Sequence, residues 1–143
     1  MITEIDKNSA LVLIDLQKSI VDMQLAHPVN NVLQNAAKLV DAFHKAGRPV
    51  VLVNVNTGNA KWVQARKDAR SPVRARQADW LEIAGEIKTQ ADDIFITKHT
   101  WGAFFETPLH QQLQQRGVTG IVLAGIATSI GVEGTARQAS ELG

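Results

Sequence analysis

Four short runs of apolar, mostly β-branched residues recur along the chain, and polar residues follow each of them. The runs occupy residues 10–14, 49–55, 93–97 and 120–125. Their hydrophobicity is nearly continuous rather than alternating, which is typical of strands that are covered on both faces. We therefore predict four buried β-strands.

The segment between the first two runs carries a helical pattern. Apolar residues from Val29 to Phe43 recur on one stripe, and Gly47 and Pro49 follow them. This pattern predicts an amphipathic helix that ends at the glycine.

Other segments predict three further helices and one long loop. The helices are expected at 80–89, where the pattern is weakest, from Thr107–Pro108 to Gly117, and from Gly131 or Val132 to Leu142. Residues 56–78 are polar, rich in arginine and interrupted by Pro72, so we expect a long loop or lid there.

Strand and helix alternate along the chain, which is typical of a parallel sheet with right-handed crossovers and helices on both faces. We expect a single domain over residues 1–143 with a three-layer α/β/α, Rossmann-like architecture. Ligands of such folds bind outside the carboxyl ends of the strands. The first candidates for a site therefore follow the four runs: Asp15 and Gln17, Asn54 and Asn56, 98–101, and 126–131.

Composition and charge narrow the possible partners. Fifteen Lys and Arg residues against 14 Asp and Glu give a net charge of +1, and aspartates dilute the basic cluster at 61–76. We therefore expect no nucleic-acid partner. No apolar run approaches the roughly 20 residues that span a bilayer, and no leader pattern is visible, so we expect a cytoplasmic protein without a membrane partner.

The chain contains no cysteine. Disulfides, thiolate metal sites and a cysteine nucleophile are therefore excluded. The four histidines show no metal-ligand spacing, and we expect His44 and His110 to be solvated on helices. No glycine-rich phosphate loop follows the first run, so neither a metal nor a cofactor is expected.

Two charged residues end predicted buried strands. Asp15 closes the first run and Lys98 follows the third. A charge in this position is costly unless it has a partner or a function, although each residue could simply cap a loop or reach solvent. The small residues at 125–137 form a strand-to-helix junction that could present backbone N–H groups to an anion, or could serve only close packing.

Three motifs around these residues resemble the isochorismatase-like hydrolases, a family that includes nicotinamidases and N-carbamoylsarcosine amidohydrolases. The motifs are Ala10-Leu-Val-Leu-Ile-Asp-Leu-Gln17, then Lys98-His-Thr-Trp-Gly-Ala-Phe104 with Thr107-Pro-Leu, and Gly125-Ile-Ala-Thr-Ser-Ile-Gly-Val-Glu-Gly-Thr-Ala-Arg137. The resemblance covers nearly the whole chain. It implies the strand order 3-2-1-4, which the family extends to 3-2-1-4-5-6, so we expect the domain to be truncated at its C-terminus.

The family carries an Asp-Lys-Cys triad. Asp15 and Lys98 match its first two members, and Gly131 stands at the cysteine position. Glycine has no side chain, so covalent catalysis from this position is impossible. Similar members without the cysteine hydrolyse a vinyl ether, which implies that Asp15 acts as a general acid. Burial would raise the pKa of Asp15 and Lys98 would lower it, and the sequence leaves this balance open.

The resemblance also implies a cis peptide bond between Ile126 and Ala127. The N–H groups of Ala127 and Gly131, with Thr128 and Ser129 between them, would form a cradle for a carboxylate or a carbonyl. A small, carboxylated substrate is therefore expected. Further substrate contacts are expected from Gln17, Trp101, Phe104 and Arg74.

Three functions remain open from the sequence. The first is a cysteine-independent hydrolase of a vinyl ether or a related C–O bond, and the second is a catalytically silent member that binds a small molecule or joins an assembly. The third is an amidohydrolase of C–N bonds with Ser129 or Thr128 as the nucleophile. The Asp-x-His-x-x-x-His metal motif of nicotinamidases is missing from 54–62, so we expect neither zinc nor nicotinamidase activity.

The fourth run would form an apolar strand at the edge of the sheet. Such an edge tends to associate with another chain. We therefore expect a homo-oligomer, a dimer or larger.

Overall fold

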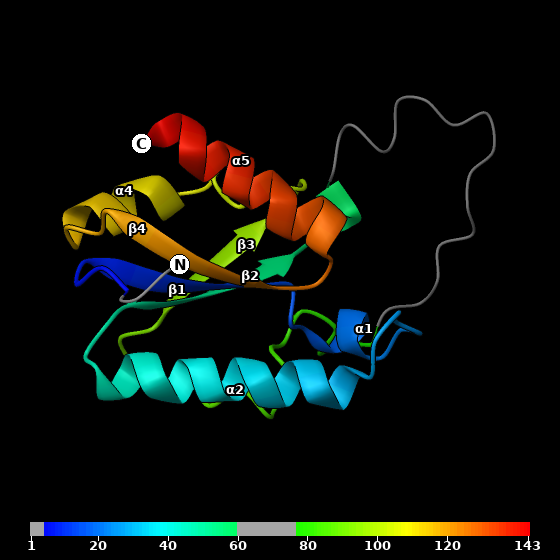
Figure 1. Ribbon diagram of the computed structural model, residues 1–143. Helices are drawn as coiled ribbons and strands as arrows, with labels where there is room; N and C mark the ends of the chain where they lie inside the picture. The colour runs from blue at the N-terminus through cyan, green and yellow to red at the C-terminus, as the bar shows by residue number, and fades with distance from the viewer. Residues whose placement is uncertain (1–4, 60–76) are drawn as a thin grey trace.

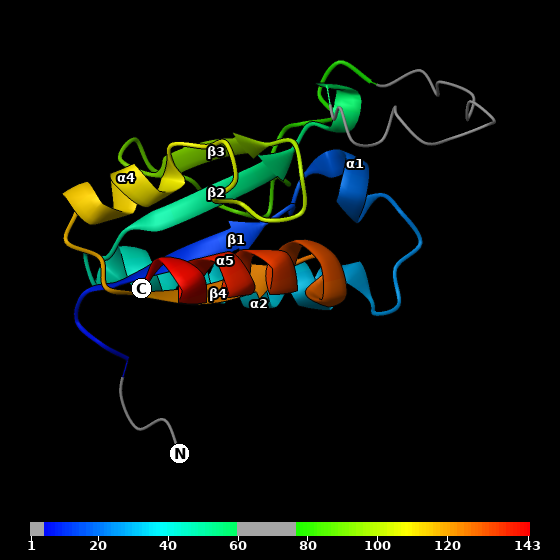
Figure 2. The same ribbon diagram turned by 90° about the horizontal axis from the view of Figure 1, so that it is seen from above.

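A parallel sheet of four strands forms the centre of the molecule. The computed structural model describes residues 5–59 and 77–143. The strands are β1 (Ser9–Ile14), β2 (Val50–Val55), β3 (Ile94–Lys98) and β4 (Gly120–Gly125). They pair in parallel in the order β3-β2-β1-β4, so the four predicted strands and the order 3-2-1-4 are confirmed (Figure 2).

Helices cover both faces of this sheet. They are α1 (Lys18–Val21), α2 (Val29–Lys45), α4 (Leu109–Gln115) and α5 (Glu133–Leu142), with a 3-10 turn at Thr57–Asn59 and a π-helical turn at Thr128–Val132. The long helix α2 lies on one face, and α4 and α5 lie on the other (Figure 1). The three-layer α/β/α architecture is therefore confirmed.

Strand β1 lies between two apolar layers. Leu11 and Leu13 pack with residues of α2 such as Val40, whereas Val12 and Ile14 join the layer under α4. This arrangement explains the continuous hydrophobicity of β1, because successive side chains of a strand point to opposite faces. Each such side chain contributes roughly 1.5–3 kcal/mol when fully buried.

The two outer strands, β3 and β4, do not have the predicted cover on both faces, and all six residues of β4 are only partly buried. Ile94, Ile96 and Lys98 are buried, but Phe95 is 58% exposed and Thr97 is exposed as well. For β3 the reason is position, because it is an outer strand and α2 packs against β1, β2 and β4.

Residues 80–89 do not form the predicted helix. The Lys18 N–H donates to Glu82 O at 2.9 Å, and the Ala84 N–H donates to Leu16 O at 2.9 Å. The backbone of this segment therefore pairs with the chain that follows β1, and this pairing takes the place of helical hydrogen bonds. The helix α1, which the sequence did not predict, lies in the same region.

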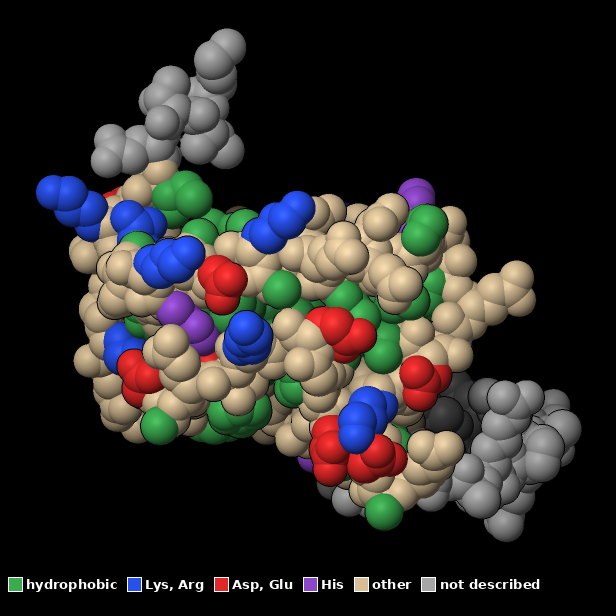
Figure 3. Space-filling model, turned by 90° about the horizontal axis from the view of Figure 1, so that it is seen from below, with side chains coloured by type: hydrophobic (Ala, Val, Ile, Leu, Met, Phe, Trp, Pro, Cys, Tyr) green, Lys and Arg blue, Asp and Glu red, His purple; other side chains and the backbone are tan. Residues whose placement is uncertain are grey.

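The surface around α2 mixes charges of both signs. Acidic and basic side chains are interspersed on this face, with apolar side chains between them (Figure 3). His44 at the end of α2 is not solvated as expected, because its Nε2 lies 2.8 Å from Asp93 Oδ1 and both side chains are largely buried. Within the described ranges, no helix is long and apolar enough to cross a membrane.

The chain turns sharply after β4. Gly125 has a φ of 136°, and a Cβ atom at this position would overlap the carbonyl oxygen of Ile14 in the neighbouring strand. A cis peptide bond joins Ile126 and Ala127. The predicted last helix follows, with its regular part in α5 and the π-helical turn in front of it.

Candidate active site

Asp15 lies at the carboxyl end of the central strand β1. Its φ of 55° is in the left-handed region, which turns the chain away from the sheet directly after Ile14. Aspartate tolerates this conformation better than most residues because its short polar side chain can bond locally. The backbone N–H of Asp15 still donates to Val53 O at 2.8 Å, and the residue is only 6% exposed.

Lys98 ends β3 and reaches over β2 to the same place. Two inter-strand spacings of about 4.8 Å separate β3 from β1, a span that the long lysine side chain and Asp15 bridge together. Lys98 is 2% exposed, and its Nζ donates to Asp15 Oδ2 at 2.9 Å and to Thr100 O at 3.1 Å. The two predicted charged residues therefore form a buried ion pair.

Burial and the Lys98 ammonium act on Asp15 in opposite directions, and burial has the larger effect. Burial raises the pKa of the Asp15 carboxyl to about 6, although the Lys98 ammonium pulls the pKa down through its charge and its hydrogen bond. The second carboxyl oxygen, Oδ1, is buried without a hydrogen-bond partner in the described part of the chain. A carboxyl in this state can donate a proton near neutral pH.

Gly131 lies directly against the ion pair. A Cβ atom on Gly131 would lie 3.2 Å from Asp15 Oδ2, 3.5 Å from Lys98 Nζ and 2.9 Å from Ile14 Cγ2. The three positions of the predicted triad are therefore in contact, and the third contributes no side chain.

The turn before Gly131 faces solvent. Ala127, Thr128, Ser129 and Ile130 are exposed, whereas Gly131 is buried. The carbonyl oxygen of Ala127 accepts the N–H groups of Ile130 at 3.1 Å and Val132 at 3.2 Å, which closes the π-helical turn. Its own N–H has no acceptor among residues 5–59 and 77–143, so it is available to a bound group.

Gln17 serves the fold. It is fully buried, its Oε1 accepts the Val55 N–H at 2.6 Å, and its Nε2 donates to Ser19 Oγ at 2.9 Å and to Trp80 O at 3.3 Å. These bonds join the ends of β1 and β2 to the segment around residue 80. The structure therefore places the Gln17 amide within the protein's own hydrogen-bond network.

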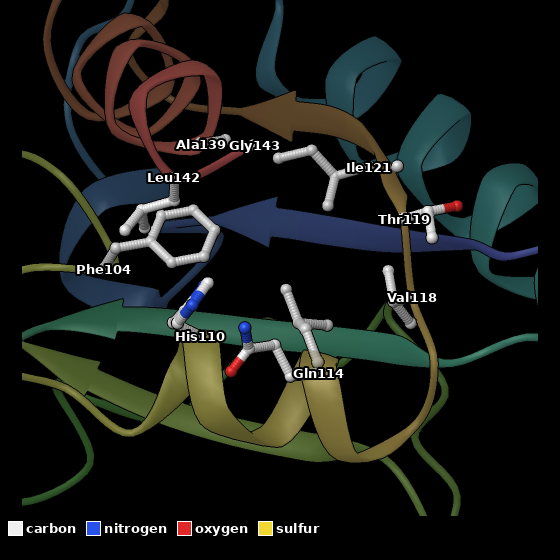
Figure 4. A pocket seen from close by; sticks show the side chains of 11 residues that line it. Phe104, His110, Gln114, Val118, Thr119, Ile121, Ala139, Leu142 and Gly143 are labelled. Atoms are coloured by element: carbon white, nitrogen blue, oxygen red, sulfur yellow. The ribbon is translucent and has the colours of Figure 1, made fainter.

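The aromatic candidates lie in two different places. Trp101 is 58% exposed in the loop after β3, and its Cβ would lie 3.3 Å from a Cβ on Gly134. The Phe104 ring instead lines a cavity of about 280 Å³ between α4, β4 and α5, where it meets His110 edge-on at 6.5 Å (Figure 4). The residues of the Asp15–Lys98 pair do not line this cavity. Arg74 lies outside the described residues.

Two residues of α5 that the sequence did not single out hold the loop after β3. Thr135 Oγ1 accepts the Ala103 N–H at 3.1 Å and donates to Gly131 O at 2.7 Å, and Gln138 Oε1 accepts the Phe104 N–H at 3.0 Å. One signal was present, because a threonine four residues after Gly131 in a helix can bond back to its carbonyl. The hydrogen bond between Thr135 and the distant loop could not be predicted from the spacing of residues in the sequence.

The described residues hold no cluster of three or more His, Cys, Asp or Glu side chains that could bind a metal ion. The functional groups that the described residues bring together at this site are the carboxyl of Asp15, the ammonium of Lys98 and the neighbouring backbone.

Comparisons with known proteins agree with the fold. A family model described as Isochorismatase domain matches residues 9–143. YwoC, an uncharacterized isochorismatase family protein of Bacillus subtilis (strain 168), is 45% identical over 140 residues, which are 96% of this chain and 72% of that protein. These values place the two sequences well within the range of clear relatives.

Solved structures give the same result. An isochorismatase family protein from Burkholderia thailandensis is 38% identical with a TM-score of 0.84, and the match covers 96% of this chain and 74% of that one. The N-carbamoylsarcosine amidase of Thermoplasma acidophilum is 28% identical with a TM-score of 0.73, covering 92% of this chain and 75% of that one. The chain thus belongs to the isochorismatase family, a family of hydrolases.

Proposed function

We propose that this protein hydrolyses a vinyl ether or a related C–O bond in a small, carboxylated substrate without a covalent intermediate. The observation that carries the proposal is the buried Asp15 carboxyl, which lies 2.9 Å from Lys98 Nζ and whose pKa burial raises to about 6. Gly131 supplies no nucleophile next to this carboxyl, so the attacking group must be water.

The proposed reaction uses one proton and one water molecule. Protonated Asp15 donates its proton to the enol-ether carbon, which forms a C–H bond and leaves an oxocarbenium ion. Water then adds to this cation and gives a proton back to the Asp15 carboxylate. The resulting hemiketal breaks its C–O bond, which yields a carbonyl compound and an alcohol. General acid catalysis of this kind contributes roughly 10²–10⁴-fold.

The substrate's carboxylate has two candidate partners in this proposal. The Ala127 N–H is exposed without an acceptor in the described ranges, and the Lys98 ammonium is close to Asp15. Both groups favour a bound anion. An anion close to Asp15 would raise the pKa of its carboxyl further, which keeps the proton in place until it is transferred.

The direct test is turnover of isochorismate and simpler enol ethers by the purified protein and by Asp15→Asn. We expect the wild-type kcat/KM to fall as pH rises through about 6, since the protonated carboxyl is the active form. Asp15→Asn should lose activity by roughly 10²-fold or more. Equal turnover by the two proteins would overturn the proposal, and His27→Gln, a change away from the site residues, serves as the control.

A second candidate is binding without turnover, which the missing side chain at Gly131 favours. A protein of this kind would bind a carboxylated ligand, measured by calorimetry, equally well with and without the Asp15 and Lys98 side chains. Hydrolysis of C–N bonds is a third candidate, since the N-carbamoylsarcosine amidase is a structural relative and Thr128 and Ser129 are exposed. An acyl-enzyme trapped on either hydroxyl and found by mass spectrometry would support it.

A further inference from the structure

A single buried hydroxyl group joins two segments that flank the Asp15–Lys98 pair. Thr135 in α5 is 0% exposed. Its Oγ1 donates to Gly131 O at 2.7 Å in the turn beside Asp15, and it accepts the Ala103 N–H at 3.1 Å from the loop after β3. The bond to Gly131 is common for a threonine in a helix, but the bond to a loop 32 residues away is not explained by helix formation.

The loop that Thr135 holds also positions the ammonium group. Lys98 Nζ has two acceptors, Asp15 Oδ2 at 2.9 Å and the carbonyl oxygen of Thr100 at 3.1 Å. Thr100 lies only three residues before Ala103, so the place where Ala103 is fixed limits where the Thr100 carbonyl can lie. The direction of the Lys98 side chain therefore depends on a hydrogen bond made by α5.

A second side chain of α5 acts on the same loop. Gln138 Oε1 accepts the Phe104 N–H at 3.0 Å. The Gln138 amide also lies so close over Gly102 that a Cβ atom at that position would overlap it. Consecutive N–H groups of the loop, from Ala103 and Phe104, are thus bound by two residues of one helix.

We propose that Thr135 is a positioning residue for the Asp15–Lys98 pair, and that its hydroxyl keeps the Lys98 ammonium on Asp15 Oδ2 by fixing the loop at Ala103. The importance of this role for catalysis rests on the proposed function, in which Asp15 is the acid. The coupling itself can be measured without any substrate.

Removal of the hydroxyl has a defined electrostatic consequence. The Lys98 ammonium lowers the pKa of Asp15 through its charge and its hydrogen bond, whereas burial raises it. A loop that is no longer fixed at Ala103 lets the ammonium move away from Asp15, so the lowering contribution becomes smaller and the pKa of Asp15 rises. Among the described residues, Lys98 is the charged group that acts on Asp15.

The test is the pH titration of the Asp15 side-chain carboxyl carbon by NMR in the intact chain. Thr135→Val keeps the shape of the side chain and removes the hydroxyl, and we expect the pKa of Asp15 to rise by about half a pH unit or more. Lys98→Met removes the ammonium altogether and should therefore give the largest rise in the pKa of Asp15. Thr135→Ser should restore the wild-type titration, and Thr97→Val on the exposed face of β3 should leave it unchanged.

Gln138→Met provides a second variant in a half-buried position, where loss of folding is not expected. It frees the Phe104 N–H and should raise the pKa of Asp15 in the same direction by a smaller amount. A folded Thr135→Val protein with the wild-type titration would overturn the proposal. If Thr135→Val does not fold, an unchanged titration in Gln138→Met would overturn it instead.

This experiment separates the two proposals. If no vinyl ether is hydrolysed, the proposed function fails while the titration still decides whether Thr135 positions Lys98. If turnover is found, the pH at which kcat/KM falls should be higher in Thr135→Val than in the wild type. In Thr135→Ser it should be the same as in the wild type.

Discussion

Gly131 has an unusual property at the residue scale, because its backbone packs directly against a buried carboxyl and it carries no side chain. The position that a side chain would take lies 3.2 Å from Asp15 Oδ2 and 3.5 Å from Lys98 Nζ. A side chain here would have to displace Ile14 or the ion pair. The glycine therefore matters for this close packing as well as for the nucleophile it lacks.

Gly131→Ala tests how tightly this position is packed. The added methyl group would lie 2.9 Å from Ile14 Cγ2, which belongs to a fully buried and stiff side chain. We expect the free energy of unfolding to fall by about 1–2 kcal/mol from overpacking. The fall is measured by urea denaturation.

Gly85→Ala is the matched control, because no atom lies within 4 Å of the added Cβ and the glycine has no positive φ. It should change the free energy of unfolding by no more than about 0.5 kcal/mol. Equal stabilities of the two variants would show that the space beside Asp15 is larger than the structure indicates.

Residue-scale prediction from sequence worked where the physical signal is local. A charge at the end of an apolar strand needs a partner, and this argument singled out Asp15 and Lys98, which form an ion pair at 2.9 Å. Thr135 and His44 carry no such signal, because a helical threonine or histidine looks the same whether it faces solvent or a distant loop. Their partners, Ala103 and Asp93, are set by tertiary packing.

At the scale of elements, the junction between β4 and the π-helical turn depends on close approach of two backbones. Gly125 adopts a φ of 136°, and any Cβ there would overlap Ile14 O. Apolar periodicity predicted the strands and the longer helices correctly, but it wrongly predicted a helix for the segment 80–89. Its hydrogen bonds run to the chain after β1, a pairing that local propensity does not encode.

Gly125→Ala tests this junction. We expect it to lower the free energy of unfolding by about 3 kcal/mol or more, because both the φ and the overlap with Ile14 O oppose a side chain. Gly120→Ala at the other end of β4 is the control, since its Cβ would lie an ordinary 3.5 Å from Ser9 Oγ. Both are measured by thermal and urea unfolding, and a Gly125→Ala protein as stable as Gly120→Ala would contradict this view of the junction.

At the scale of the whole molecule, β4 is an outer strand of the sheet in the part of the chain that the structure describes. It is the last strand in the order β3-β2-β1-β4, and all six of its residues are only partly buried. An edge of this kind favours association with a second chain. We expect the 143-residue chain to form a dimer or larger species at micromolar concentration, measured by sedimentation equilibrium; a monomeric mass at every concentration would contradict this.

The free energy of unfolding should also depend on pH through the buried carboxyl of Asp15. The pKa of Asp15 is about 6 in the folded protein and near 3.8 when the chain is unfolded and solvated. Between these values the folded state holds a proton that the unfolded state has lost. The contribution of Asp15 to the free energy of unfolding should therefore be highest below about pH 4, decrease as pH rises from 4 to 6, and stay constant above that range.

The Asp15 contribution to this decrease should reach about 3 kcal/mol at most, from a difference of roughly 2 pKa units. Urea unfolding at closely spaced pH values measures it, with Asp15→Asn as the comparison. The asparagine variant cannot titrate at this position, so its stability should fall less between pH 4 and 6, while contributions from distant groups are common to both proteins. Parallel stability curves would mean that the folded protein does not raise the pKa of Asp15, and the proposed acid would then lose its proton near pH 4 rather than near pH 6.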